Sequence, residues 1–142
     1  MTDSLFWEDI NEGDELTTLE FPITVKNLVM AVVGTRDFMP YHHDSEYTKS
    51  TGSRDQFVNT MFNQAMFGRF VTDWCGPEAD FRSTTLRMIG QVCPGDTAIL
   101  EGRVGSKRRD GDDYRVELEL NSRNHLGTAC AATASMALPS RD

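Results

Sequence analysis

The sequence predicts an α+β fold in which a curved antiparallel sheet of about five strands wraps around one long apolar helix. The first observation is the segment 59–74, NTMFNQAMFGRFVTDW, whose apolar side chains recur at helical spacing. The second is the series of strand-like segments that follows it, separated by short turn signals. No repeat, low-complexity tract or linker divides the chain, so we expect residues 1–142 to form a single domain.

The first third of the chain predicts one strand and one helix. Residues 1–15 are acidic and irregular, whereas residues 16–23 alternate between apolar and polar as a half-buried strand does. Thr24 is a suitable N-cap for a helix over 25–33, and Gly34 is a suitable residue to end it. The expected buried stripe of this helix consists of Leu28, Val29 and Val32.

The segment 45–56 is polar and contains a turn signal at 50–53, so we expect loop structure there. The helix at 59–74 that follows has an apolar surface so wide that it should be covered on most sides. Gly76 and Pro77 are expected to end it. Its apolar residues are Met61, Phe62, Ala65, Met66, Phe67, Phe70, Val71 and Trp74.

The remainder of the chain predicts four consecutive strands joined by short turns, which favours an antiparallel meander. In the third of them Val116 and Leu118 alternate with Glu117 and Glu119, so this strand should have one dry and one wet face. The four expected strands cover 83–91, 97–104, 114–124 and 128–138.

Charge and cysteine content limit the classes of function. The formal net charge is −8, which argues against general nucleic-acid binding and against attachment to an anionic membrane. The only dense basic run, at 107–109, is interpreted as a solvated hairpin loop. The chain start has no apolar signal region and no segment is long enough to span a bilayer. The three cysteines have no metal-ligand spacing and predict reduced thiols in a cytoplasmic protein.

The segment 37–44, DFMPYHHD, is the strongest candidate for a functional site. Pro40 removes a backbone donor and favours an extended Met39, so Asp37 and His42 should lie on a turn after the helix. An acid and an imidazole on such a loop can both move protons. The alternatives are that Asp37 only ends the helix and that His42 is a structural histidine.

Other chemistry has weaker support in this sequence. A metal site built from His42, His43 and Asp44 is disfavoured, because adjacent histidines rarely converge on one ion. We expect His43 to be structural and Asp44 to fix the loop by accepting backbone N–H groups. The chain contains no Gly-x-Ser-x-Gly motif and no phosphate-binding Gly-rich loop, and it predicts no cofactor.

The chain resembles the MaoC-like hydratases of the hotdog fold over nearly its whole length. The likeness is carried by the lead-in FWEDINEGDEL, by Asp37, His42 and Asp44, by the apolar helix, and by the turn at 94–96. A closer likeness, to the short MaoC-like subunits of steroid side-chain hydratases, is carried by segments at 34–38, 42–44, 57–59 and 71–74. Those short subunits work with a second MaoC-like chain.

The resemblance implies reversible addition of water to a trans-2-enoyl-CoA, with Asp37 and His42 as the catalytic pair. It also implies that a backbone N–H at the start of the central helix holds the thioester oxygen. Here that group is the N–H of Thr60, beside Asn59, where many family members have a His-Gly pair. Many members also have Asn at the position of Met39.

Two other functions remain open from the sequence. A hotdog thioesterase would need a carboxylate on the central helix, which offers only Asp73 near its far end. A non-catalytic partner subunit is the second alternative. The resemblance implies an acyl-CoA substrate and either a homo-oligomer or a heteromer with a second MaoC-like chain.

Overall fold

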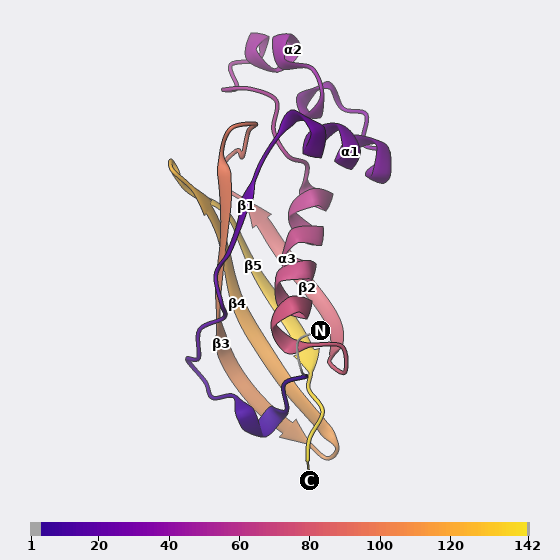
Figure 1. The fold of residues 1–142 in the computed structure, drawn as a ribbon, viewed down its shortest axis with the longest axis vertical. Coiled ribbons are helices and arrows are strands. Elements are labelled where there is room, and N and C mark those ends of the chain that lie inside the picture. Colours follow the sequence, from indigo (N-terminus) through magenta and orange to yellow (C-terminus); the bar gives the residue numbers. More distant parts are fainter. Residues whose placement is uncertain (1–3, 142) are drawn as a thin grey trace.

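The computed structural model describes residues 4–141, which form one antiparallel sheet with the strand order β1-β3-β4-β5-β2 (Figure 1). All neighbouring strands pair in antiparallel fashion. The strands are β1 (Leu19–Pro22), β2 (Asp80–Met88), β3 (Thr97–Asp110), β4 (Asp113–Asn124) and β5 (Gly127–Ala137). The expected α+β architecture with about five strands is confirmed.

Helix α3 (Thr60–Cys75) lies along one face of the curved sheet and supplies the centre of the core (Figure 1). Phe67, Phe70 and Val71 are buried against side chains from the sheet. The opposite side of the helix is open, and Met61 is 41% exposed. The prediction that this helix is covered on most sides is therefore wrong for the isolated chain, since no other element of the described residues lies over that side.

The predicted four-strand meander is only partly correct. Strands β3, β4 and β5 form it, but β2 pairs with β5 and so lies at the far edge of the sheet. Residues 89–96 carry the chain away from this edge before β3 begins. Alternation within a strand reports which of its faces is dry and gives no information about its neighbour, which is why the sequence did not predict this order.

Strand β3 continues to Asp110 instead of ending near Val104, so the basic run at 107–109 lies on a strand and not in a solvated loop. The Lys107 ammonium donates to the carbonyl oxygens of Trp7 at 2.6 Å and Ile10 at 2.5 Å. It also lies 3.9 Å from the centre of the Trp7 ring, a favourable cation–π position. Lys107 thereby holds the N-terminal segment against the sheet.

Helix α1 (Val25–Thr35) begins at the predicted cap, because the Thr24 hydroxyl accepts a hydrogen bond from the Asn27 N–H at 3.2 Å. It passes through Gly34 and ends at Arg36, which adopts the left-handed conformation with φ 56°. Leu28 and Val32 are buried as expected, but Val29 is 46% exposed. The prediction that Val29 is buried is wrong, because only the narrow side of α1 that carries Leu28 and Val32 packs against the rest of the chain.

A short helix, α2 (Ser45–Ser50), occupies part of the segment predicted as loop. Asp44 is its N-cap and accepts a hydrogen bond from the Tyr47 N–H at 2.9 Å. Helices α1 and α2 both lie beyond the end of the sheet, and α1 is the one next to the start of α3 (Figure 1). Within residues 4–141, no helix has the length and apolarity that crossing a membrane requires.

Candidate active site

The segment 37–44 lies where α1 and the start of α3 meet, at one end of the sheet (Figure 1). Arg36 turns the chain out of α1, and Met39 is extended with φ −61° and ψ 127°. Pro40–His42 then form a single 3₁₀ turn. This backbone path places Asp37 and His42 on the same side of the loop.

The carboxylate of Asp37 faces the imidazole of His42, with 3.4 Å between Oδ2 and Nε2. The Asp37 side chain is 26% exposed and that of His42 is 12% exposed. Both groups are therefore held by protein contacts on most sides while solvent still reaches them. The structure brings these two predicted residues together.

The tautomer of His42 follows from its other contact. Its Nδ1 atom lies 2.8 Å from the carbonyl oxygen of Phe57, an oxygen that can only accept a hydrogen bond. Nδ1 must therefore carry a proton, and in the neutral ring the lone pair is on Nε2, facing Asp37. The ring also packs edge-on against the Phe57 side chain, with 5.3 Å between centroids.

Asn59 connects the pair to α3. Its Oδ1 accepts a hydrogen bond from the Phe62 N–H at 2.8 Å and so caps the helix. Its Nδ2 donates to Asp37 Oδ2 at 3.2 Å and to Thr35 Oγ1 at 2.9 Å. The side chain is buried, with 2% exposure, so its amide has little freedom to leave these partners.

Thr35 is a residue of the candidate site that the sequence did not predict. Its hydroxyl donates to the carbonyl of Ala31 at 2.6 Å, which leaves Oγ1 aimed at Asn59 as an acceptor. Thr35 and Asn59 are 24 residues apart, and nothing in their spacing indicates a contact. The adjacency of Thr35 to the predicted Asp37 turn is the only signal available in the sequence.

Thr60 is the first residue of α3, and its side chain is exposed. The opening N–H groups of a helix have no partner within the helix, and no residue of the described chain accepts from the Thr60 N–H. The aligned peptides of this 16-residue helix also place partial positive charge at that end. An oxyanion next to Thr60 would find both a free donor and a favourable dipole.

The loop that carries Phe57 is anchored by the carboxylate of Asp55. This side chain accepts hydrogen bonds from Ser45 Oγ at 2.6 Å and from the Gln56 N–H at 2.7 Å, and Lys49 lies 3.3 Å away. The Ser45 hydrogen bond is the main cause that lowers the pKa of Asp55. Asp55 is therefore ionised at neutral pH and keeps this loop on α2.

The remaining predicted polar residues lie beside the pair and point to other partners. His43 Nε2 is 3.0 Å from the Phe38 carbonyl, and Asp44 caps α2. Neither side chain touches Asp37. In the described part of the chain, no three His, Cys, Asp or Glu side chains are grouped as a metal site would require.

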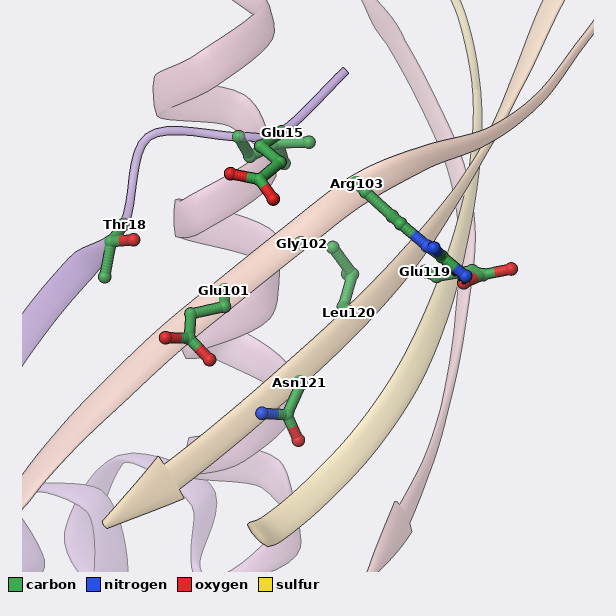
Figure 2. A pocket seen from close by; sticks show the side chains of 9 residues that line it. Glu15, Thr18, Glu101, Gly102, Arg103, Glu119, Leu120 and Asn121 are labelled. Carbon is green, nitrogen blue, oxygen red and sulfur yellow. Dashed lines mark hydrogen bonds and ion pairs between the residues drawn. The ribbon is translucent and has the colours of Figure 1, made fainter. Parts of the chain in front are cut away.

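A large hollow lies elsewhere, on the outer face of the sheet between the lead-in to β1 and strands β3 and β4 (Figure 2). It measures about 530 Å³. Two of its carboxylates already pair with arginines: Glu119 with Arg103 at 2.6 Å and Glu101 with Arg123 at 2.8 Å. It has no contact with Asp37 or His42.

The core beneath the start of α3 is tightly packed. The gap beneath the first turns of the helix, lined by Val58, Phe62 and Met66 among others, measures about 10 Å³. A cavity of that size is at the lower limit for one water molecule. An acyl chain therefore cannot enter the core at this point, whereas a more open hollow of about 320 Å³ lies farther along α3, lined by Leu19, Phe70 and Trp74 among others.

Comparison with known proteins identifies the family. No family model matches the chain. The 3-oxo-4,17-pregnadiene-20-carboxyl-CoA hydratase beta subunit of Mycobacterium tuberculosis is 32% identical over 111 residues, which is 78% of this chain and 83% of that protein. The ChsH1-ChsH2 complex from the same organism matches with a TM-score of 0.84 and 31% identity, over 90% of this chain and 98% of that one.

A MaoC-like dehydratase from Rhodospirillum rubrum shows the same fold at 20% identity, with a TM-score of 0.85 over 98% of this chain and 99% of the other. The fold, the curated relative and the solved complex agree with one another. This chain belongs to the MaoC-like hydratase family of the hotdog fold.

Proposed function

We propose that this chain carries the catalytic pair of an enoyl-CoA hydratase, which adds water to a trans-2-enoyl-CoA and gives a 3-hydroxyacyl-CoA. The observation that carries the proposal is the 3.4 Å approach of Asp37 Oδ2 to His42 Nε2 at the open start of α3. The roles of the individual residues follow from the geometry around this pair.

Asp37 and His42 present two acceptors to a water molecule. The carboxylate oxygen accepts, and Nε2 of the neutral imidazole accepts because the ring proton is on Nδ1, which donates a hydrogen bond to the Phe57 carbonyl. A water that donates one proton to each of them has its oxygen lone pairs directed outward, toward a bound substrate. Asp37 and His42 thus orient the water and are placed to take a proton from it.

In the proposed reaction the water oxygen forms a bond to C3, and one of its protons passes to the Asp37–His42 pair. The electron pair of the C2–C3 double bond moves toward the thioester and gives an enolate. The pair then delivers a proton to C2, so the net change is the addition of one water molecule.

The enolate oxygen needs a hydrogen-bond donor. We assign this role to the Thr60 N–H, which has no acceptor among the described residues and lies at the positive end of α3. The Thr60 side chain is exposed and so lies outside the packed core beneath the helix. Asn59 supports the same site by capping the helix and holding Asp37.

We further propose a bulky acyl group, such as a steroid-derived one. The curated relative is named for a pregnadiene carboxyl-CoA, and the gap beneath the first turns of α3 is too small for an acyl chain. Apolar side chains next to the pair are instead open to solvent, among them Val33, Phe38 and Met39. These residues would contact the acyl group from outside the core.

Two exposed features support assembly with a second MaoC-like chain: the uncovered side of α3 next to the proposed acyl site, and the outer edge of strand β2. Strand β2 pairs only with β5, so its other edge presents unpaired backbone groups. The similar solved structure is a complex of two chains. We propose that the partner lies along β2 and the open side of α3 and completes the acyl site, with a homodimer as the alternative.

The thioesterase alternative has less support. Asp73 is the only acid on α3, and it lies near the far end of the helix with its side chain 62% exposed. It also pairs with Arg69 at 3.2 Å. No carboxylate of α3 therefore lies near the helix start, where the thioester is proposed to bind.

The three buried free thiols are compatible with the cytoplasm, where we place the enzyme.

The test is incubation with a panel of enoyl-CoA thioesters in ¹⁸O-labelled water, using the chain alone and after co-purification with a candidate partner chain. A hydratase places ¹⁸O on C3 and leaves the thioester intact. A thioesterase places ¹⁸O in a free carboxylate and releases coenzyme A thiol, which would overturn the proposal. Native mass measurement of the same samples separates a heteromer from a homodimer.

A further inference from the structure

An ion pair between the partly exposed Arg54 and the buried Asp96 lies next to the loop that holds His42. Asp96, in the turn before β3, is only 4% exposed. Its carboxylate accepts hydrogen bonds from the Cys93 N–H at 2.9 Å and from Asn124 Nδ2 at 3.0 Å. Arg54 completes the set with a two-pronged contact, in which Nη1 donates to Oδ1 at 2.9 Å and Nη2 donates to Oδ2.

Arg54 lies three residues before Phe57, on the loop between α2 and α3. The same loop is tied to the chain between β2 and β3 at a second point, since the Val58 N–H donates to the Val92 carbonyl at 3.0 Å. The Phe57 carbonyl lies between these two attachments. Asp55 and the Phe57 N–H, which donates to the Tyr41 carbonyl at 3.1 Å, hold the same loop on its other side. The contact of Arg54 with Asp96 is therefore one of the contacts that set the position of the carbonyl.

The Phe57 carbonyl determines which nitrogen of His42 carries the proton. While it accepts from Nδ1, the Nε2 lone pair faces Asp37 and can accept from a water. If the carbonyl moves away, the ring can adopt the other tautomer, with Nε2–H donating directly to the Asp37 carboxylate 3.4 Å away. In that state the imidazole no longer accepts from a water.

We propose that Arg54 is a positioning residue, which acts through its buried contact with Asp96 to hold the Phe57 carbonyl and thereby the water-accepting tautomer of His42. Its role in turnover rests on the proposed hydratase function, whereas its effect on the imidazole does not. The other titratable groups near Asp96 are the buried Cys93 thiol and His125, whose Nδ1 is 3.5 Å from Oδ1 and whose side chain is mostly exposed. The exposed His125 cannot replace the forked guanidinium contact.

The experiment compares the wild type with Arg54→Met and Arg54→Lys by recording the ¹⁵N shifts of the histidine rings. The chain has only three histidines, so His43→Gln and His125→Gln variants assign the His42 signals. Arg103→Met is the matched control, because it removes an arginine–carboxylate pair on the outer face of the sheet (Figure 2). The wild type and the control should both show His42 protonated at Nδ1.

For Arg54→Met we expect loss of the pure Nδ1–H signature and a fall in kcat of roughly 10- to 100-fold, with a smaller change in KM. Arg54→Lys keeps the positive charge but loses the two-pronged contact. Its kcat should therefore lie between that of the wild type and that of Arg54→Met. A pure Nδ1–H signature in Arg54→Met would overturn the proposal. If Arg54→Met does not fold, an unchanged His42 spectrum in Arg54→Lys together with unchanged kcat overturns it instead.

The two proposals fail in different ways. If no thioester is hydrated but the His42 tautomer changes in Arg54→Met, the proposed function fails and the positioning contact remains. If hydration is observed and the tautomer does not respond to Arg54, only the positioning proposal fails.

Discussion

Asn59 binds Asp37 with the same side chain that caps α3: its Nδ2 donates to Asp37 Oδ2 at 3.2 Å, while its Oδ1 accepts from the helix. The proposed base and the proposed oxyanion donor are therefore fixed to each other through one residue. Asn at this position has two separable roles, since the cap needs an acceptor and Asp37 needs a donor.

These roles can be separated by substitution. Asn59→Asp keeps the capping oxygen but replaces the donor to Asp37 with a second carboxylate at a buried position, so we expect activity to be lost and the free energy of unfolding to fall through the repulsion and desolvation of the two carboxylates. Asn59→Ala loses both contacts and should also lower the free energy of unfolding by about 1 kcal/mol from the cap alone. Urea denaturation and hydration assays on both variants test this.

Full activity in Asn59→Asp would contradict the assigned contact with Asp37. The matched control is Asn27→Asp in α1, where the side chain contacts only the Thr24 cap. This control should leave the rate of hydration unchanged.

The long elements were predictable because their signals are local. The apolar positions of α3, such as Phe67 and Phe70, lie at helical spacing, and the alternation of β4 is visible in Val116 and Leu118. The position of β2 was not predictable, because strand order depends on pairing across the whole sheet. Helix α2 was missed because a six-residue polar helix that depends on its Asp44 cap has no apolar stripe.

Within the site, Asp37 and His42 were found because both lie on one short segment with Pro40. The partners that orient them were not found in the same way. Phe57 acts through its carbonyl, a group that every residue has, and Thr35 acts through a contact with Asn59 far along the chain. Sequence spacing reports contacts within one turn or strand, and these contacts join different elements.

Gly102 should be intolerant of a side chain. A Cβ there would lie 2.7 Å from Leu120 Cδ2 and 3.3 Å from Phe70 Cε1, at the centre of the contact between α3 and the sheet. We expect Gly102→Ala to lower the free energy of unfolding by about 1–3 kcal/mol through overpacking. Gly34→Ala is the control, because its Cβ meets nothing within 4 Å and it lies in a helix.

The control should leave stability unchanged or raise it by up to about 1 kcal/mol, since Ala favours a helix over Gly. Urea denaturation of the two variants measures both effects. Equal stability of Gly102→Ala and the wild type would contradict the close packing of α3 on β3.

Asp96 should contribute to stability at neutral pH and lose this contribution in acid. Burial by itself raises the pKa of Asp96, but hydrogen bonds from Arg54, the Cys93 N–H and Asn124 outweigh it, so the pKa is lowered overall. Because the pKa of Asp96 is lower in the folded state than in the unfolded state, ionised Asp96 stabilises the fold at pH values above the unfolded pKa of about 3.9. That stabilisation disappears as the pH falls through the folded pKa.

We therefore expect Asp96→Asn to be less stable than the wild type at pH 7 and to show a flatter decrease in unfolding free energy below pH of about 4. Denaturation series at stepwise lower pH measure this, with Glu78→Gln on an exposed loop as the control. The same pH dependence in Asp96→Asn and the wild type would rule out the assigned contribution.

The three thiols should be inert in the folded protein. Burial raises the pKa of Cys75 to about 11, and burial also raises the pKa of Cys93 and Cys130. Because the thiolate is the reactive form, a thiol-specific disulfide reagent at pH 8 should label none of them without denaturant and all three in urea. Rapid labelling of any one thiol in the native protein would show that its burial is incomplete.

The central claim is that Asp37 and His42 act together on one water molecule. The most direct measurement is the rate of ¹⁸O incorporation at C3 of an enoyl-CoA substrate by the assembled enzyme. Asp37→Asn and His42→Ala should each lower this rate by roughly 10²- to 10⁴-fold, and the double variant should be little worse than either single one.

His43→Ala is the matched control, because His43 is the adjacent imidazole and contacts the Phe38 carbonyl instead of Asp37. It should keep the wild-type rate. Wild-type rates in both Asp37→Asn and His42→Ala would contradict the account, as would multiplicative losses in the double variant, which would mean that the two groups act independently.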